Sequence, residues 1–266
     1  MRIRGKLGIV GGNGQLGSAI AQGLLTAGAI APEDLWISAR SGRAEALDNW
    51  PGIAVTTDNM ALAGACDTIL MSVPPAGFGK VGITAPDRLV VSVMAGVTRE
   101  RLSPETGAAR VVRAMSSPAA ADRMAYSPWI GSAAVTDADR ETIHALFSAI
   151  GQTDELDDEA HIDHFTAMTG PVPGFVALYA DCMIRYACAA GIAPETAERA
   201  VRQLFLSSGA VLGASQESPA EQVRAMVDYA GTTAAGLLAM ERAGLEEVIA
   251  TGLDAAVARA RRIGEE

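Results

Sequence analysis

The pattern of apolar residues changes partway along this chain of 266 residues. In the first part, helical segments alternate with short apolar runs typical of buried parallel strands, at residues 7–11, 66–73, 89–94 and 109–115. Beyond about residue 158 the short runs disappear, and apolar residues recur at helical spacing over residues 172–190, 194–212 and 232–260. The pattern predicts an α/β domain with a doubly wound parallel sheet at residues 1–157 and an all-α domain at residues 158–266.

The second part is divided by residues that end and start helices. Gly191 followed by Pro194 predicts the end of one helix and the start of the next, and Ser218-Pro219 predicts a further start. The predicted helices carry apolar residues on more than one face, which a single chain leaves uncovered. We therefore expect an all-α dimerisation domain that forms a homodimer or a larger homo-oligomer.

The start of the chain combines an apolar strand, a glycine-rich turn and a helical segment. Residues 11–17 read G-G-N-G-Q-L-G, which contains the spacing G-x-G-x-x-G. In this motif the first glycine allows a tight turn, the second lets the backbone approach a pyrophosphate, and the third lets helix and strand pack closely. The free N–H groups of the helix start then bind the anion. The motif predicts a Rossmann domain that binds a dinucleotide, with contacts from Gly12, Asn13, Gly14, Gln15 and Leu16.

A further predicted strand, at residues 34–43, follows the first helical segment, and its end indicates which dinucleotide is bound. Enzymes that use NAD carry Asp or Glu about 20 residues beyond the glycines, to hold the ribose 2′-hydroxyl. Here the strand ends in Ser38, Arg40, Ser41 and Arg43. Arginine binds a phosphate through two parallel hydrogen bonds, so this end favours NADP(H). The alternative is NAD, with two arginines that are merely solvated.

Further strand ends are expected to line the cofactor crevice. In open parallel sheets, ligands bind beyond the carboxyl ends of the strands. Val73-Pro74 and Ala95-Gly96 follow two predicted strands and are expected beside the ribose and the nicotinamide. Asn59 is a candidate for the adenine side.

The charge balance disfavours two classes of partner. The chain has 21 basic and 31 acidic residues, a formal net charge of −10, and its basic residues are scattered. This distribution disfavours nucleic acid and anionic membranes. We find no signal-peptide pattern and no run of about 18 apolar residues, so the cytoplasm is the expected location.

Cysteine and histidine spacing gives little support for a metal site. Cys66, Cys182 and Cys188 lack C-x-x-C spacing and have apolar neighbours, so they are expected to be reduced packing residues. His161 and His164 stand three apart on a predicted helix beside acidic residues, which raises the possibility of a metal site. Because the sequence supplies no obvious third imidazole or thiolate, we prefer a half-exposed helix face and no metal.

Several ordered segments of the chain resemble the pyrroline-5-carboxylate reductase family. Glu159 to Phe175 aligns without gaps to the family segment E-x-x-x-D-x-x-T-x-x-S-G-S-G-P-A-Y. The other segments that carry the resemblance are Asn59, V-S-V-M-A-G-V-T at residues 91–98, A-A-G-I-A-P at 189–194 and G-T-T at 231–233. Together they cover nearly the whole chain.

The resemblance implies NADPH-linked reduction of a cyclic imino acid, such as pyrroline-5-carboxylate, to an amino acid such as proline. It assigns Gly231, Thr232 and Thr233 to the substrate, through backbone N–H groups that open a helix and can bind a carboxylate. We expect the Thr233 hydroxyl to donate a hydrogen bond to the substrate nitrogen. Taken alone, G-T-T is an ordinary helix N-cap.

The chain departs from the family where substrate is expected. The family's S-P-G-G-T-T stands here as D-Y-A-G-T-T at residues 228–233, and its S-G-S-G-P-A-Y as T-G-P-V-P-G-F at 169–175. R-x-M-P-N-T-P appears from Arg113 without the asparagine, and the glycine turn is one residue longer, as in prephenate dehydrogenases. A carboxylate at Asp228 facing the site would oppose a substrate carboxylate and favour a cationic amine.

Three functions therefore stay open: a pyrroline-5-carboxylate reductase, a reductase of the same fold for a different imine or imino acid, and a non-catalytic NADP-binding dimer. A β-hydroxyacid dehydrogenase is disfavoured because it needs a catalytic lysine at the start of the helical domain, and the only lysines are Lys6 and Lys80. Reductases of the related F420-linked group share the first domain but usually lack so large a helical part.

Overall fold

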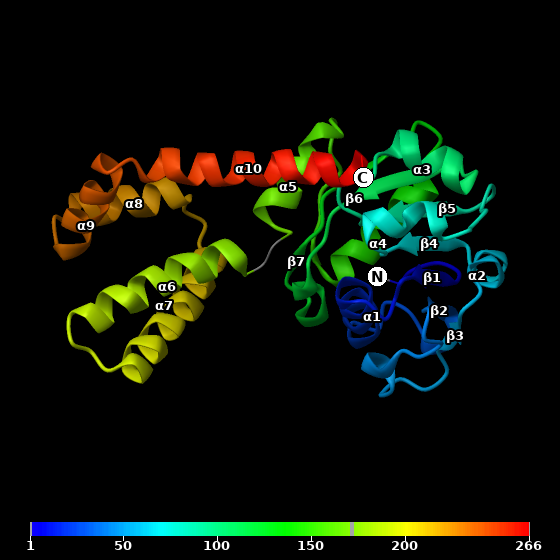
Figure 1. The fold of residues 1–266 in the computed structure, drawn as a ribbon, viewed down its shortest axis with the longest axis horizontal. Coiled ribbons are helices and arrows are strands. Elements are labelled where there is room, and N and C mark those ends of the chain that lie inside the picture. Colours follow the sequence, from blue (N-terminus) through cyan, green and yellow to red (C-terminus); the bar gives the residue numbers. More distant parts are fainter. Residues whose placement is uncertain (1, 171–172, 266) are drawn as a thin grey trace. The chain divides into compact units, whose positions relative to one another are not determined.

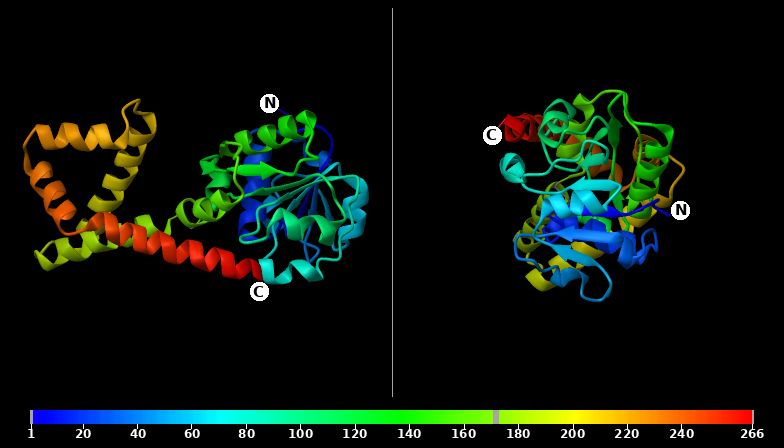
Figure 2. Two further views of the ribbon diagram at one scale, coloured as in Figure 1. Left: turned by 90° about the horizontal axis from the view of Figure 1, so that it is seen from above. Right: turned by 90° about the vertical axis from the view of Figure 1, so that its right-hand side faces the viewer.

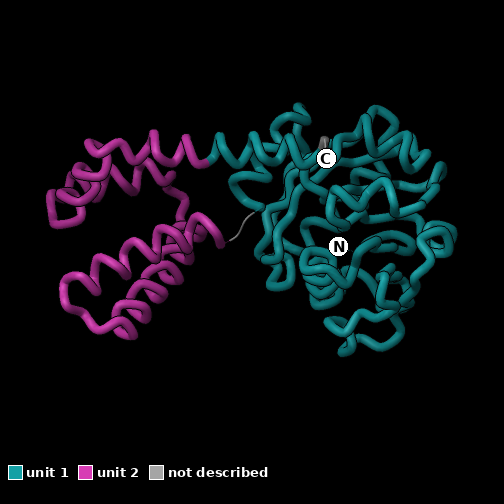
Figure 3. Tube along the Cα trace, viewed as in Figure 1, with its two compact units in different colours: residues 1–172, 253–266 teal, residues 173–252 magenta. Residues whose placement is uncertain are grey.

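The computed structural model of the chain describes residues 2–170 and 173–265 (Figure 1). The chain divides into two compact units (Figure 3): unit 1 is Met1–Val172 with Leu253–Glu266, and unit 2 is Pro173–Gly252. The domain boundary after residue 157 stays a prediction, since unit 1 also takes in helical segments from beyond it.

Unit 1 is built on a seven-stranded sheet with the order β3-β2-β1-β4-β5-β6-β8. Its strands are β1 (Leu7–Val10), β2 (Leu35–Ser38), β3 (Ala54–Thr56), β4 (Thr68–Met71), β5 (Leu89–Ser92), β6 (Val111–Ala114) and β8 (Trp129–Gly131). All neighbours pair in parallel except β6 and β8, which are antiparallel. Short strands β7 (Ala125–Tyr126) and β9 (Gly151–Gln152) form a second, parallel pair. The predicted doubly wound parallel sheet is confirmed.

Helices cover both faces of this sheet (Figure 2). Helices α1 (Gln15–Thr26) and α4 (Asp137–Ala149) pack on one face, and α2 (Asn59–Ala65) and α3 (Arg99–Thr106) pack on the other. Adjacent strand residues point to opposite faces, so Ile9 lies in one hydrophobic cluster and Val10 in the other. Short 3-10 turns occur at Pro32–Asp34, Glu45–Leu47, Pro75–Lys80 and Pro118–Asp122. Both faces of the sheet are therefore buried, as its continuous apolar strands require.

The helical part of the chain begins with α5 (Ala160–Met168), which belongs to unit 1. Unit 2 contains α6 (Gly174–Ala189), α7 (Pro194–Ala214), α8 (Pro219–Asp228) and α9 (Thr232–Arg242). The last helix, α10 (Leu245–Glu265), starts in unit 2 and ends in unit 1.

The predicted helix boundaries are largely confirmed. Gly191 has φ of 86° between α6 and α7, and the Ser218 hydroxyl accepts the Glu221 N–H in a capping box at the start of α8. The prediction of one run over residues 232–260 is wrong, because Gly244 has φ of 79° and separates α9 from α10. The predicted helix start at Val172 lies outside the described residues.

Unit 2 buries few side chains. In its described part only Ala197, Val201 and Ala234 are buried, whereas Leu178 is 60% exposed and Leu206 is 69% exposed. This agrees with the expectation that a single chain leaves these helices uncovered. A search of residues 2–170 and 173–265 finds no helix long and apolar enough to span a membrane.

The three cysteines differ in burial. Cys66 is buried, as expected, and burial raises the pKa of its thiol to about 12. Cys182 is exposed on α6, so the prediction that it packs inside the chain is wrong for the single chain. Its apolar neighbours in sequence lie on a helix that has no buried side chains.

Candidate active site

The glycine turn between β1 and α1 is closed by backbone contacts that exclude side chains. Gly11 has φ of 80°, and the Gly14 N–H donates to the Gly11 carbonyl over 3.0 Å. A Cβ on Gly17 would lie 2.7 Å from that same carbonyl oxygen, and one on Gly12 would lie 2.8 Å from the Ile37 side chain. These positions therefore require glycine for the helix to start so close to the strand.

The first turn of α1 offers backbone donors to an anion. Its N-cap is Gly14, which has no side chain to satisfy those donors, and the first intrahelical bond runs from the Ser18 N–H to the Gly14 carbonyl. Asn13, Gly14 and Gln15 are exposed, and Leu16 is half-buried. Exposed N–H groups at the positive end of a helix fit a pyrophosphate, so the residues present fit the expected dinucleotide.

The end of β2 carries two free cations. Arg40 and Arg43 are exposed, and neither guanidinium group has an acidic partner among the described residues. The Asn13 amide donates to the Ser41 hydroxyl over 3.3 Å, which joins the glycine turn to this loop. The structure thus brings Asn13, Ser41 and the arginine-bearing loop together, as a site for a ribose 2′-phosphate requires.

Asn59 and Ser38 hold the strand ends in place. The Ser38 hydroxyl donates to the Asn59 side-chain carbonyl, and the Asn59 amide donates to the Val81 carbonyl over 2.6 Å. Both polar ends of Asn59 are therefore bonded to the chain. These bonds fix the relative positions of β2, α2 and the segment after β4, while the predicted adenine contact of Asn59 stays a prediction.

The segments after β4 and β5 lie beside the glycine turn and the last helix. A Cβ on Gly11 would meet the Ser72 carbonyl at 2.5 Å and the Val73 side chain at 2.9 Å, which places Val73-Pro74 next to the turn. Ala95 packs on a small cluster that includes Met115. Gly96 has φ of 72° and meets the C-terminal end of α10.

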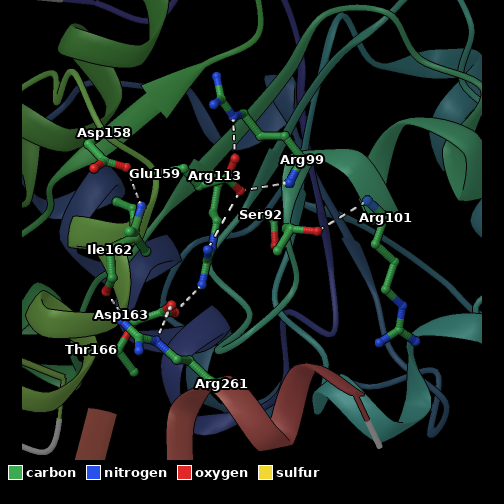
Figure 4. A network of polar contacts seen from close by, with 12 residues as sticks. Ser92, Arg99, Arg101, Arg113, Asp158, Glu159, Ile162, Asp163, Thr166 and Arg261 are labelled. Carbon is green, nitrogen blue, oxygen red and sulfur yellow. Dashed lines mark hydrogen bonds and ion pairs between the residues drawn. The ribbon is translucent and has the colours of Figure 1, made fainter. Parts of the chain in front are cut away.

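A network of ion pairs around the buried Arg113 connects β6, α3, α5 and α10 (Figure 4). Arg113 donates to Asp163 and lies 3.6 Å from a Glu159 oxygen. The Arg99 side chain donates to Glu159 over 2.8 Å, and Arg261 lies 3.5 Å from Asp163. In the sequence, Arg113 belongs to one family motif, and Glu159 and Asp163 belong to another. The sequence alone does not show that these residues are in contact.

Arg113 is an unusual residue for a strand interior. It is 2% exposed, and its Nε–H has no hydrogen-bond partner among the described residues. A buried guanidinium group is tolerated because Asp163 and Glu159 compensate its charge. The network therefore has a structural role, because it connects a strand and three helices within unit 1.

In unit 2, the start of α9 exposes a second set of backbone donors. Gly231 is the N-cap of α9, and Thr232 and Thr233 follow it, both exposed. Ala230 has φ of 56°, a left-handed conformation that favours glycine, and the family motif has glycine at this position. Tyr229 is 85% exposed, and its ring lies 3.3 Å from where a Cβ on Gly231 would stand. The altered residue Tyr229 therefore lies directly beside the helix start.

No metal centre emerges near the two histidines of α5. His161 and His164 are both exposed, and residues 2–170 and 173–265 hold no group of three or more His, Cys, Asp or Glu that could bind a metal ion.

Comparison with known proteins finds two matching families. Residues 159–263 match the family described as pyrroline-5-carboxylate reductase dimerisation, and residues 6–96 match the family described as NADP oxidoreductase coenzyme F420-dependent. The pyrroline-5-carboxylate reductase of Pseudomonas aeruginosa is 31% identical over 220 residues, which cover 80% of this chain and 81% of that protein.

Two solved structures share the fold over the full length. The pyrroline-5-carboxylate reductase of Streptococcus pyogenes has a TM-score of 0.82 at 26% identity, with coverage of 97% of this chain and 98% of that one. The Plasmodium falciparum pyrroline carboxylate reductase, solved with NADP bound, has a TM-score of 0.84 at 23% identity, with coverage of 99% and 100%. By its sequence and its fold, this chain belongs to the pyrroline-5-carboxylate reductase family.

Proposed function

We propose that this protein is an NADP(H)-dependent oxidoreductase that reduces the C=N bond of pyrroline-5-carboxylate to give proline. The observation that carries the proposal is the glycine turn before α1, with two unpaired arginines at the end of β2, in a chain of this reductase family. The relatives named above are pyrroline-5-carboxylate reductases, and one of them was solved with NADP bound.

The cofactor is assigned to unit 1. The first turn of α1 binds the pyrophosphate, and the loop after β2 binds the 2′-phosphate. The proposed contact residues are Gly12, Asn13, Gly14, Gln15, Leu16, Ser38, Arg40, Ser41, Asn59, Val73, Pro74, Ala95 and Gly96.

The substrate carboxylate is assigned to the start of α9 in unit 2. Gly231 and Thr232 present backbone N–H groups to it, at the positive end of an 11-residue helix. Reduction of an imine adds a hydride to carbon and a proton to nitrogen; NADPH would supply the hydride, and water the proton. Thr233 donates its hydroxyl to the substrate nitrogen, which orients the ring for the transfer.

The working form is a homodimer or larger homo-oligomer joined through the helical part. Support comes from the match of residues 159–263 to a dimerisation family and from the exposed apolar side chains of α6 and α7. The cytoplasm, expected from the sequence, is the proposed location.

A second candidate, reduction of a different imine or imino acid, is favoured by one observation. Tyr229 lies against Gly231, and Asp228 precedes it as an exposed acid, where the family motif has proline and serine. A carboxylate at this position repels a substrate carboxylate and attracts an amine cation. A bulky phenol beside the helix start also changes the space left for the ring.

The test measures oxidation of NADPH and NADH in parallel with pyrroline-5-carboxylate and a panel of other cyclic imines. The native chain is compared with Thr233→Ala, which removes the hydroxyl, and with Thr233→Ser, which keeps it. Turnover of pyrroline-5-carboxylate with NADPH, reduced about 10²-fold or more by alanine and retained by serine, supports the proposal. Turnover of another imine alone supports the second candidate. NADPH binding without any turnover contradicts both and leaves a non-catalytic dimer.

A further inference from the structure

The C-terminal end of α10 sits directly on the loop that follows β5. A Cβ on Gly96 would lie 2.4 Å from the Gly264 nitrogen and 2.5 Å from the Ala260 carbonyl oxygen. A Cβ on Gly264 would lie 1.9 Å from the Gly96 carbonyl oxygen. The two backbones touch only because both residues are glycine, and all of these residues belong to unit 1.

The Arg101 side chain holds the end of α10 at this contact. Its Nη1 donates to the Gly264 carbonyl over 2.6 Å, and its guanidinium carbon lies 5.6 Å from the centre of the Phe78 ring. Phe78 belongs to the 3-10 turn that directly follows Val73-Pro74. A single side chain thus links the end of the last helix to the turn that follows Val73-Pro74.

An ion pair holds the same turn of α10 at a second point. Arg261 lies 3.5 Å from Asp163, which also accepts from the buried Arg113 (Figure 4). The last turn of α10 is therefore fixed at two points, by Arg101 at its end and by Asp163 one turn earlier. Through Asp163 and Arg113 this turn is joined to β6, and through Gly264 it rests on the loop after β5.

We propose that the C-terminal turn of α10 positions the cofactor loop after β5. In this turn Gly264 packs against Gly96, and its carbonyl accepts a hydrogen bond from Arg101. Gly264 and Arg101 are positioning residues that act through the backbone of Ala95-Gly96. This inference rests on the proposed function for the assignment of that loop to NADP(H). It gives the end of the chain a role in cofactor affinity, separate from the role of the helical part in assembly.

Two glycines in one helix provide a matched test. Gly264→Ala forces a methyl group into the Gly96 carbonyl, whereas Gly252→Ala makes the same change in α10 where the nearest atom, of Phe175, is 3.9 Å away. The dissociation constant of NADPH is measured by fluorescence titration without substrate, together with KM for NADPH and for pyrroline-5-carboxylate and the melting temperature. We expect Gly264→Ala to weaken NADPH binding about tenfold and to raise the KM for NADPH alone, since small misplacements in a site are costly. Gly252→Ala should bind NADPH like the native chain.

Variants of Arg101 keep the test decisive if Gly264→Ala fails to fold. Arg101→Met removes the donor to Gly264 but keeps an apolar side chain near Phe78, and Arg101→Lys restores a cationic donor. Weaker NADPH binding in the methionine variant, recovered in the lysine variant at an unchanged melting temperature, supports the inference. Native-like NADPH affinity in Gly264→Ala and Arg101→Met overturns it. Because binding is measured without substrate, a chain that binds NADPH but reduces no pyrroline-5-carboxylate refutes the proposed substrate and still decides this inference.

Discussion

The two units of this chain differ in how completely each one covers its own apolar residues. In unit 1 both faces of the sheet are packed, and residues such as Leu70 and Phe147 are fully buried. In unit 2, α6 and α8 have no buried residue, while leucines and valines on α6, α7 and α10 are largely exposed. Burial of apolar surface is the dominant favourable term in folding. Unit 1 therefore covers its own hydrophobic core, whereas the helices of unit 2 need a partner to cover them.

The same difference appears in the charged groups. The buried ions of unit 1 form a shared network around Arg113, but the ion pairs of unit 2, such as Arg185 with Asp181 on α6, are exposed neighbours on a helix. Exposed pairs contribute little free energy, and buried pairs become costly when one partner is removed. Single substitutions in unit 1 are thus expected to unfold the protein. Single substitutions in unit 2 are expected to dissociate its subunits.

The largest expected effect comes from removing the charge of Arg113. Arg113→Met would leave Asp163 and Glu159 without their buried cation and should lower the free energy of unfolding by roughly 3–5 kcal/mol. The matched control is Arg185→Met, whose ion pair is exposed and contributes about 0.2–1 kcal/mol. Urea unfolding followed by circular dichroism measures both, and equal losses would contradict the proposed contrast between the units.

A charge on the exposed apolar surface of unit 2 should separate the subunits. Leu206→Glu loses roughly 1.5–3 kcal/mol per leucine buried on assembly, and a symmetric dimer buries one from each copy. Light scattering should show a smaller particle that still binds NADPH through unit 1. Ser208→Glu adds the same charge two residues further along α7, on the other side of the helix. If Leu206→Glu keeps the native mass, this residue is not part of the interface.

Removal of an arginine after β2 should change cofactor choice without affecting the fold. Arg40→Ala loses a charge-assisted bond to the 2′-phosphate, worth about 1.5–3 kcal/mol, and should raise the KM for NADPH by roughly 10- to 100-fold. The KM for NADH should stay the same, since NADH has no 2′-phosphate. Arg224→Ala in unit 2 removes an exposed arginine elsewhere and serves as the control. An equal rise for both cofactors would refute the assignment.

The smallest effect is expected for the thiols. The pKa of Cys66 is raised by burial from 9.0 to about 12, so its thiolate is scarce at pH 8 and alkylation should await unfolding. Because the unfolded chain loses this proton first, the thiol favours the folded state less as pH rises from 9.0 toward 12. Mass spectrometry after brief alkylation should find Cys182 modified before Cys66, unless a partner subunit covers Cys182. Rapid labelling of Cys66 in the folded protein would contradict its burial.

Much of unit 1 was predictable because its signals are local. Continuous apolar runs predict β1, β4, β5 and β6. The spacing of the glycines predicts the turn between β1 and α1. The break at Gly244 was missed because apolar spacing continues across it, and only the left-handed backbone there reveals the separation of α9 and α10. The hydrogen bonds of Asn59 with Ser38 and Val81 join separate segments, so no local pattern indicates them, and its contact with the cofactor stays a prediction.

The sequence by itself determined the order of the elements, the dinucleotide turn and the cationic end of β2. It also determined that the helical part has more apolar faces than one chain covers. Each of these features depends on residues that are close together in the chain. The tertiary structure alone decided that Arg113 meets Asp163 and Glu159, and that Gly264 rests on Gly96. These contacts join residues from separate elements, and some are far apart in the chain. Their formation depends on how the packed sheet and helices bring their ends together.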